Sequence, residues 1–128
     1  MSAAQLILIR GVPGSGKSTL ARLFAQAGYS WYETDMYWES RGGFDPAKLS
    51  EAHVWCYTQV TNNLKADNSV VVSNTFIKNW EMAPYIKYAK ENDLTFAVIE
   101  ATGQYQNVHG VPEDKVQRMR EMFEPLDY

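Results

Sequence analysis

The sequence predicts a three-layer α/β fold with a mainly parallel sheet of about four strands. Segments with strand-like and helix-like apolar patterns alternate along the chain, and this alternation is typical of such folds. A glycine-rich turn also joins the first strand-like segment to the first helical one. The chain has 128 residues, of which 45% are hydrophobic, enough for one hydrophobic core and too few for two. We therefore expect one domain over residues 1–128.

Each element has its own signal in the sequence. Residues 5–9 form an apolar, β-prone run typical of a strand buried on both faces. The first helix has apolar side chains at helical spacing, at Leu20, Leu23, Phe24 and Ala27. Residues 30–34 indicate a short second strand, and Asp45 and Pro46 begin a long helix over 47–66. The remaining predictions are a strand at 69–73, a helix at 79–92, a strand at 94–100, a loop at 101–111 and a helix at 113–124.

The glycine-rich turn reads GVPGSGKS over residues 11–18 and matches the phosphate-binding pattern G-x-x-x-x-G-K-[ST]. Its glycines let backbone N–H groups turn toward the β- and γ-phosphates of a nucleotide, and the following helix adds its positive end. Lys17 is expected to contact the same phosphates, and the Ser18 hydroxyl to bind Mg²⁺. The pattern therefore predicts ATP and Mg²⁺ as cofactors. The predicted nucleotide-binding residues are Gly11, Pro13, Gly14, Ser15, Gly16, Lys17, Ser18 and Thr19.

In open α/β sheets, ligands bind outside the carboxyl ends of the strands. Residues 11–18, Asp35, residues 73–75 and the loop at 101–111 should therefore meet on one rim. Asp35, at the end of the second predicted strand, is a candidate for accepting a proton from a substrate hydroxyl or for holding a metal-bound water. The alternative is an aspartate that caps a turn. We therefore predict that Lys17 and Asp35 are the catalytic residues.

The third strand ends in SNT over residues 73–75, where many phosphate-loop enzymes carry an aspartate for the Mg²⁺ shell. This segment has no carboxylate. Asn74 could orient water or substrate through its amide, and Thr75 could donate a hydroxyl. A plain Asn-Thr turn at the strand end is an equal alternative.

An arginine often stabilises the charge of a phosphoryl-transfer transition state. The loop at 101–111 contains none and offers hydrogen-bonding groups, at Gln104, Gln106, Asn107 and His109. Arg120 flanks the apolar face of the last predicted helix and is the better candidate to lean inward, whereas Arg118 points away. Arg41, in the turn after the second strand, is another arginine that could swing over the site. The alternative for each is a surface charge.

Composition excludes several classes of function. The net charge of −3 argues against a protein that coats nucleic acid, but not against an enzyme that grips one strand end. With no apolar run long enough for a bilayer, we expect no membrane partner and a soluble, cytoplasmic protein.

Cys56 is predicted to be buried, and the histidines do not suggest zinc. Aromatic residues are more often core, although Tyr37 and Trp38 lie where a substrate base could stack.

A series of motifs in a fixed order supports a more specific interpretation. They are GVPGSGKST (11–19), ETDMY (33–37), FDP (44–46), EAHVW (51–55), VVSNT (71–75), WEMAPY (80–85) and NVHGVP (107–112). Over residues 6–124 the chain resembles the polynucleotide 5′-hydroxyl kinase family of P-loop kinases, in particular its compact AAA-type ATP-binding relatives. The resemblance implies transfer of the ATP γ-phosphoryl group to a 5′-hydroxyl, with Lys17 and Ser18 on the nucleotide and Asp35 as general base.

The chain departs from the family pattern at several positions. Met36 stands where the family often has a second acidic residue, and Trp38 where it has an arginine. The family lid arginine aligns with Gln106 in a shortened lid, and such an arginine is worth several powers of ten in rate. The third-strand motif is SNTF, where the family has DNTN or SDTN.

Three functions therefore stay open. The first is a kinase acting on the 5′ end of a nucleic acid or on a nucleotide-like small molecule, which Lys17, Ser18 and Asp35 favour. The second is a catalytically degenerate ATP-binding module or weak ATPase that works through a partner, which the missing lid arginine favours. A small-metabolite kinase is the third. A protein partner or an oligomer could supply the missing arginine in trans.

Overall fold

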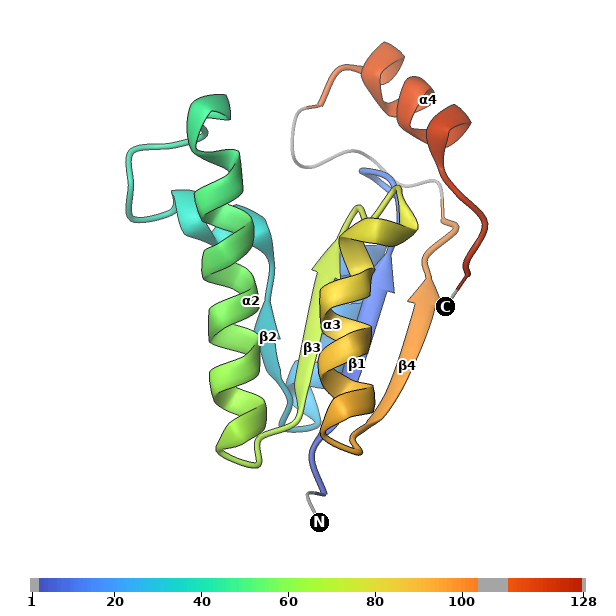
Figure 1. The fold of residues 1–128 in the computed structure, drawn as a ribbon. Helices are drawn as coiled ribbons and strands as arrows, with labels where there is room; N and C mark the ends of the chain where they lie inside the picture. The colour runs from blue at the N-terminus through green and yellow to red at the C-terminus, as the bar shows by residue number, and fades with distance from the viewer. Residues whose placement is uncertain (1–2, 104–110, 128) are drawn as a thin grey trace.

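The computed structural model describes residues 3–103 and 111–127. Within them, four parallel strands form one sheet in the order β2-β3-β1-β4 (Figure 1). The strands are β1 (Gln5–Arg10), β2 (Ser30–Tyr32), β3 (Val70–Asn74) and β4 (Thr95–Glu100). In the centre of the sheet, Leu8 lies opposite Val72 on one side and Val98 on the other. The predicted fold class and the parallel sheet are confirmed.

Helices cover both faces of the sheet and so produce the predicted three layers. On one face lie α2 (Leu49–Lys65) and α3 (Asn79–Glu91), which Figure 1 shows in front of the sheet, and α1 (Lys17–Gln26) packs on the other. A fourth helix, α4 (Glu113–Met122), lies beyond the carboxyl ends of the strands (Figure 1). Among the described residues, no helix is long and apolar enough to cross a membrane.

The two faces of β1 bury different side chains because successive residues of a strand point to opposite sides. Leu6 and Leu8 join the larger core beneath α2 and α3, and Ile7 and Ile9 join the smaller core beneath α1. The strand is thus buried on both faces, as its apolar run predicts. Cys56 is buried in the larger core, also as predicted.

The helix α1 buries fewer of its apolar side chains than its spacing suggests. Leu20 and Phe24 pack against the sheet, whereas Leu23 is 59% exposed. Within the described chain, α1 packs on the smaller core without a second helix beside it. Only the side chains that point at the sheet are therefore covered.

Several predicted boundaries shift by a few residues. The second strand ends at Tyr32 because the next residues fold into a short 3₁₀ helix, η1 (Thr34–Trp38). The predicted helix at 47–66 is divided: Asp45 accepts a hydrogen bond from the Ala47 N–H (3.0 Å) and caps a 3₁₀ turn, η2 (Pro46–Lys48), before α2 begins. The third strand begins and ends one residue later than predicted. Local capping chemistry causes the division at η2.

Candidate active site

The phosphate loop connects β1 to α1 in a conformation that its glycines permit. Gly14 and Gly16 have φ angles of 84° and 95°, in the left-handed region that other residues rarely adopt. The Ser15 N–H donates to the Val12 carbonyl oxygen (3.1 Å), which closes the turn. Gly16 precedes α1 and has no side chain to cap it, so the N–H groups of the first helical turn remain available to an anion.

The root of the loop leaves no space for a side chain at Gly11. A Cβ there would collide with the Ser15 hydroxyl and lie 2.9 Å from the Ala101 carbonyl oxygen. The Ser15 Oγ is itself buried and has no hydrogen-bond partner among the described residues. A buried hydroxyl without a partner costs free energy, and a bound phosphate would supply the missing acceptor. The loop therefore fits a nucleotide.

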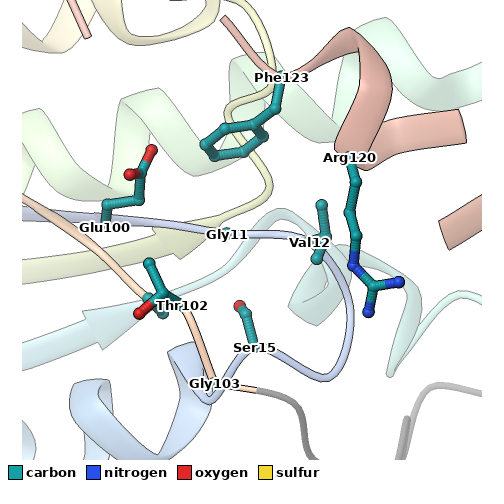
Figure 2. A pocket seen from close by; sticks show the side chains of 9 residues that line it. Gly11, Val12, Ser15, Glu100, Thr102, Gly103, Arg120 and Phe123 are labelled. Atoms are coloured by element: carbon teal, nitrogen blue, oxygen red, sulfur yellow. The ribbon is translucent and has the colours of Figure 1, made fainter. Parts of the chain in front are cut away.

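A pocket of about 260 Å³ opens beside the loop, and Figure 2 shows its lining. Gly11, Val12 and Ser15 form one wall, and residues 100–103 form another. The Gly103 N–H donates to the Ser15 carbonyl oxygen (2.9 Å), which ties the two walls together. Arg120 and Phe123 reach the pocket from the C-terminal part of the chain (Figure 2). Of the predicted rim, the phosphate loop and residues 101–103 meet at this pocket, whereas Asp35 and residues 73–75 are not among its lining residues.

Lys17 is buried, with 7% of its surface exposed. This burial lowers the pKa of its ammonium group, while the nearby Glu33 and Asp35 carboxylates act in the opposite direction. The lysine, the predicted phosphate contact, therefore lies close to two acidic side chains that follow β2.

Glu33 has no assigned role in the sequence interpretation, yet it contacts the site. The Ser18 hydroxyl donates to its Oε2 at 3.5 Å. The backbone of Glu33 is extended, with φ −134° and ψ 146°. The available signal was its position directly after β2 and two residues before Asp35.

Asp35 lies in the first turn of η1, not at a strand tip, and its side chain is exposed. Two neighbours hold this helix in place through Thr34. Asn74 Oδ1 accepts a hydrogen bond from the Thr34 backbone N–H (2.9 Å), and Thr34 Oγ1 lies 3.4 Å from His53 Nδ1. The carboxylate is thus presented to solvent on a turn fixed from β3 and α2.

The structure places Asn74 and Thr75 differently from the sequence hypothesis. The Asn74 side-chain oxygen Oδ1 accepts a hydrogen bond from the Thr34 N–H, and its Nδ2 is buried without a partner among the described residues. The Thr75 carbonyl oxygen accepts from the Gly11 N–H (3.2 Å) and joins the end of β3 to the phosphate loop. Asn74 therefore contacts the turn that carries Asp35, and its role in orienting water or substrate stays a hypothesis.

The arginines differ in their relation to the pocket. Arg120 lines it while its guanidinium also pairs with Glu113 (3.2 Å). Arg118 is exposed and pairs with Asp114. Arg41 does not lie over the phosphate loop, because its guanidinium stacks 4.0 Å above the Tyr37 ring and donates to the Tyr37 carbonyl oxygen (2.9 Å). Of the two arginine candidates, only Arg120 reaches the described pocket.

Tyr37 and Trp38 are core residues and do not form a platform for a base. They are 9% and 8% exposed and pack with Ala52 and Trp55. Residues 34–38 form η1, and both rings pack against α2. The predicted lid side chains at Gln104, Gln106, Asn107 and His109 lie outside the described residues.

Arg10, the last residue of β1, is a second residue that sequence reasoning missed. It is completely buried and donates to the Phe76 carbonyl oxygen through Nε (3.1 Å) and Nη2 (2.9 Å), and to the Ile77 carbonyl oxygen (3.2 Å). Its Nη1 lies 3.5 Å from Glu100 Oε1, an ion-pair distance without hydrogen-bond geometry. The Phe123 ring stacks against the guanidinium at 3.9 Å. The available signal was an arginine at the end of an apolar strand.

The donor atoms at the loop suit a magnesium ion. Mg²⁺ prefers oxygen ligands, and the Ser18 hydroxyl and Glu33 carboxylate supply them beside the phosphate loop. Among the described residues, no group of three or more His, Cys, Asp or Glu side chains could hold a metal on its own. A cation here would therefore need phosphate oxygens and water to complete its shell.

Comparison with known proteins agrees with this geometry. A protein-family profile described as AAA domain matches residues 6–126. The chain belongs to this AAA domain family. It is 32% identical to human NEDD4-binding protein 2 over 133 aligned residues, which cover 93% of this chain and 8% of that protein. The chain thus spans only a small part of this relative.

Solved structures show the same fold at low sequence identity. One chain of the Pnkp1/Rnl/Hen1 RNA repair complex matches with a TM-score of 0.73 and 16% identity, covering 96% of this chain and 45% of that one. A gluconokinase from Sinorhizobium meliloti matches at 0.66 and 21%, over 98% and 78% of the two chains. The APS kinase CysC of Mycobacterium tuberculosis matches at 0.56 and 19%, over 98% and 100%. This member of the AAA domain family has a P-loop kinase-like fold.

Proposed function

We propose that the chain is an ATP-dependent kinase that transfers the γ-phosphoryl group to the 5′-hydroxyl of a polynucleotide or a nucleotide-like acceptor. The observation that carries this proposal is the position of the segment 33–35 at the phosphate loop, where Glu33 Oε2 lies 3.5 Å from the Ser18 hydroxyl oxygen and the Asp35 side chain is exposed. An exposed carboxylate beside the expected γ-phosphate position can accept the proton of an incoming hydroxyl. A site that only binds nucleotide has no need of this carboxylate.

The reaction follows from the positions of these residues. The loop N–H groups and Lys17 hold the phosphates, and bound Mg²⁺ would neutralise part of their charge. The acceptor oxygen forms a bond to the γ-phosphorus, and the bond from phosphorus to the bridging oxygen of ADP breaks. The hydroxyl proton passes to Asp35, whose carboxylate is kept on the rim by the contacts of Thr34 with Asn74 and His53.

One comparison supports an acceptor that is a nucleic acid end. The match to a chain of an RNA repair complex has the highest TM-score of the three structures described above. The net charge of −3 does not exclude this acceptor, since it argues only against a protein that coats nucleic acid along its length. That relative belongs to an assembly with other proteins, which supports a partner for this chain as well.

A small-metabolite kinase is the second candidate. The gluconokinase and APS kinase matches favour it, because this chain covers 78% and 100% of their lengths. In the described chain, Arg120 is the one arginine that lines the pocket, and it is paired with Glu113. A small acceptor bound deep in the site needs fewer positive contacts than a polynucleotide does.

The test is transfer of label from γ-labelled ATP to 5′-hydroxyl RNA and DNA oligonucleotides, nucleosides and sugar acids. We expect labelled oligonucleotide with the wild-type chain and none with Lys17→Ala. Asp35→Asn should lower transfer on the order of 100-fold while a non-hydrolysable ATP analogue still binds.

The matched control is Asp45→Asn, because asparagine also caps the turn at Ala47 and the change lies outside the site. This variant should transfer phosphate as the wild type does. Labelling of a sugar acid in place of oligonucleotide would replace the proposed acceptor with the second candidate. ADP formation with no labelled acceptor, unaffected by Asp35→Asn, would contradict the kinase proposal.

A further inference from the structure

The carboxylate that usually helps to hold Mg²⁺ in phosphate-loop enzymes comes from the strand beside the loop. Here that strand, β3, ends in Ser73 and Asn74. Ser73 is buried, and its Oγ accepts a hydrogen bond from Trp31 Nε1 (2.9 Å). The Asn74 Oδ1 accepts from the Thr34 N–H (2.9 Å). Both groups thus contact the protein, and neither is an acid.

The neighbouring strand supplies an acid instead. Glu33 follows β2, which pairs directly with β3, and its Oε2 lies 3.5 Å from the Ser18 hydroxyl oxygen. Ser18 is the loop residue expected to bind the metal. Glu33 therefore contacts the expected metal-binding residue directly.

We propose that Glu33 is the protein carboxylate of the magnesium shell and takes the place of the missing acid on β3. Two adjacent oxygens of an octahedral Mg²⁺ shell, each about 2.1 Å from the ion, lie about 3 Å apart. The Ser18 and Glu33 oxygens are 3.5 Å apart, so a small rotation of the glutamate brings both to one ion. Without any movement of the glutamate, a water bound to the ion can instead donate a hydrogen bond to the Glu33 carboxylate.

This arrangement couples the metal to the acceptor side of the site. Glu33 and Asp35 are separated only by Thr34, whose backbone N–H is held by Asn74 and whose hydroxyl lies near His53. The metal ligand and the proposed general base therefore share one short segment with a common anchor. In an enzyme with its acid on β3, the metal would be held from a different segment than the base.

The inference rests on the proposed nucleotide site, not on the proposed acceptor. The test is a titration with Mn²⁺, a paramagnetic substitute for Mg²⁺, followed by electron paramagnetic resonance in the presence of a non-hydrolysable ATP analogue. Glu33→Gln removes the charge and keeps the size of the side chain. We expect this variant to bind Mn²⁺ about tenfold more weakly in the ternary complex, and Glu33→Asp to recover part of the loss.

The control is Glu39→Gln, an exposed glutamate just after η1, which should bind Mn²⁺ as the wild type does. Analogue affinity without metal shows whether each variant is folded, and we expect Glu33→Gln to retain it. Equal Mn²⁺ affinity in wild type and Glu33→Gln would overturn this inference and leave the kinase proposal standing. If the wild-type chain binds no analogue with or without Mn²⁺, the nucleotide site and both proposals fail together.

Discussion

The two ends of the phosphate loop each carry a buried cation, and the molecule uses the two in opposite ways. Arg10, immediately before the loop, directs three hydrogen bonds to backbone carbonyl groups of residues 76 and 77 and stacks on Phe123. Lys17, at the other end, is also buried, and the nearby charged groups are the Glu33 and Asp35 carboxylates. Its ammonium group is the one expected to contact a phosphate. The first cation stabilises the fold, and the second is kept for a ligand.

The comparison shows how a cation bonded to the backbone can support a loop whose own polar groups are left for a ligand. Ser15, which lies between the two cations in the sequence, has a buried Oγ with no partner among the described residues. Arg10, the residue directly before the loop, ties β1 to the segment after β3 and to the residues that follow α4. Unsatisfied polar groups at the loop are tolerated because the adjacent residue anchors three segments.

The largest effect is expected at Arg10. Arg10→Met fills much of the same volume but leaves the Phe76 carbonyl oxygen without its donors, while the Ile77 carbonyl oxygen keeps only the Glu124 N–H. Phe76 also has a φ of 46°, a strained conformation that these hydrogen bonds hold. We expect the free energy of unfolding to fall by about 3 kcal/mol in urea denaturation.

Arg22→Met is the matched control, because this arginine is exposed on α1. It should change the free energy of unfolding by less than about 0.5 kcal/mol. If the free energy of unfolding falls by the same small amount in both variants, the contacts of Arg10 do not stabilise the fold as the comparison with Lys17 requires.

Asn74 should show a smaller effect on stability and a selective one on activity. Asn74→Ala leaves the Thr34 N–H without its acceptor, so the segment that carries Glu33 and Asp35 loses its link to β3. We expect a loss of about 1–2 kcal/mol in the free energy of unfolding. The phosphoryl-transfer rate should fall about tenfold, while the affinity for a metal-free ATP analogue stays within about twofold.

Ser73→Ala provides the comparison for this variant. It removes the neighbouring polar group of β3, whose partner is Trp31 and not the η1 turn. We expect a similar loss of stability with the transfer rate preserved. Equal loss of rate in both variants would mean that Asn74 acts through general destabilisation and not by positioning the turn.

The sequence predicts one side of the site better than the other, for a physical reason. The phosphate loop and the four strands depend on local features, which are glycines at fixed spacing and short apolar runs. The contacts of Arg10 with Phe76 and of Thr34 with Asn74 join residues 66 and 40 positions apart. A single sequence does not reveal such pairs. For this reason the second strand was expected to reach Thr34. In the structure the strand ends at Tyr32, and Thr34 begins η1, where its N–H donates to the Asn74 side chain from β3.

The smallest expected change in the free energy of unfolding is at Lys17. Replacing Lys17 should raise this free energy, whereas replacing Arg10 should lower it. Burial lowers the pKa of Lys17 below the ordinary value of 10.5, so the unfolded chain binds this proton more tightly than the folded one. Below the lowered pKa the lysine is charged in both states, and the full cost of its burial is present. As the pH rises through the lowered pKa toward 10.5, that cost disappears and the wild-type chain gains stability.

Lys17→Met lacks this titration. Without nucleotide we therefore expect Lys17→Met to be more stable than the wild type at neutral pH, and the difference to shrink as the pH approaches 10.5. Urea denaturation of both chains across this pH range measures the difference, in which the other titrating groups cancel. An ATP analogue should stabilise the wild type alone. A difference that stays constant or grows with pH would show that Lys17 is not held at a cost, and the contrast with Arg10 would be lost.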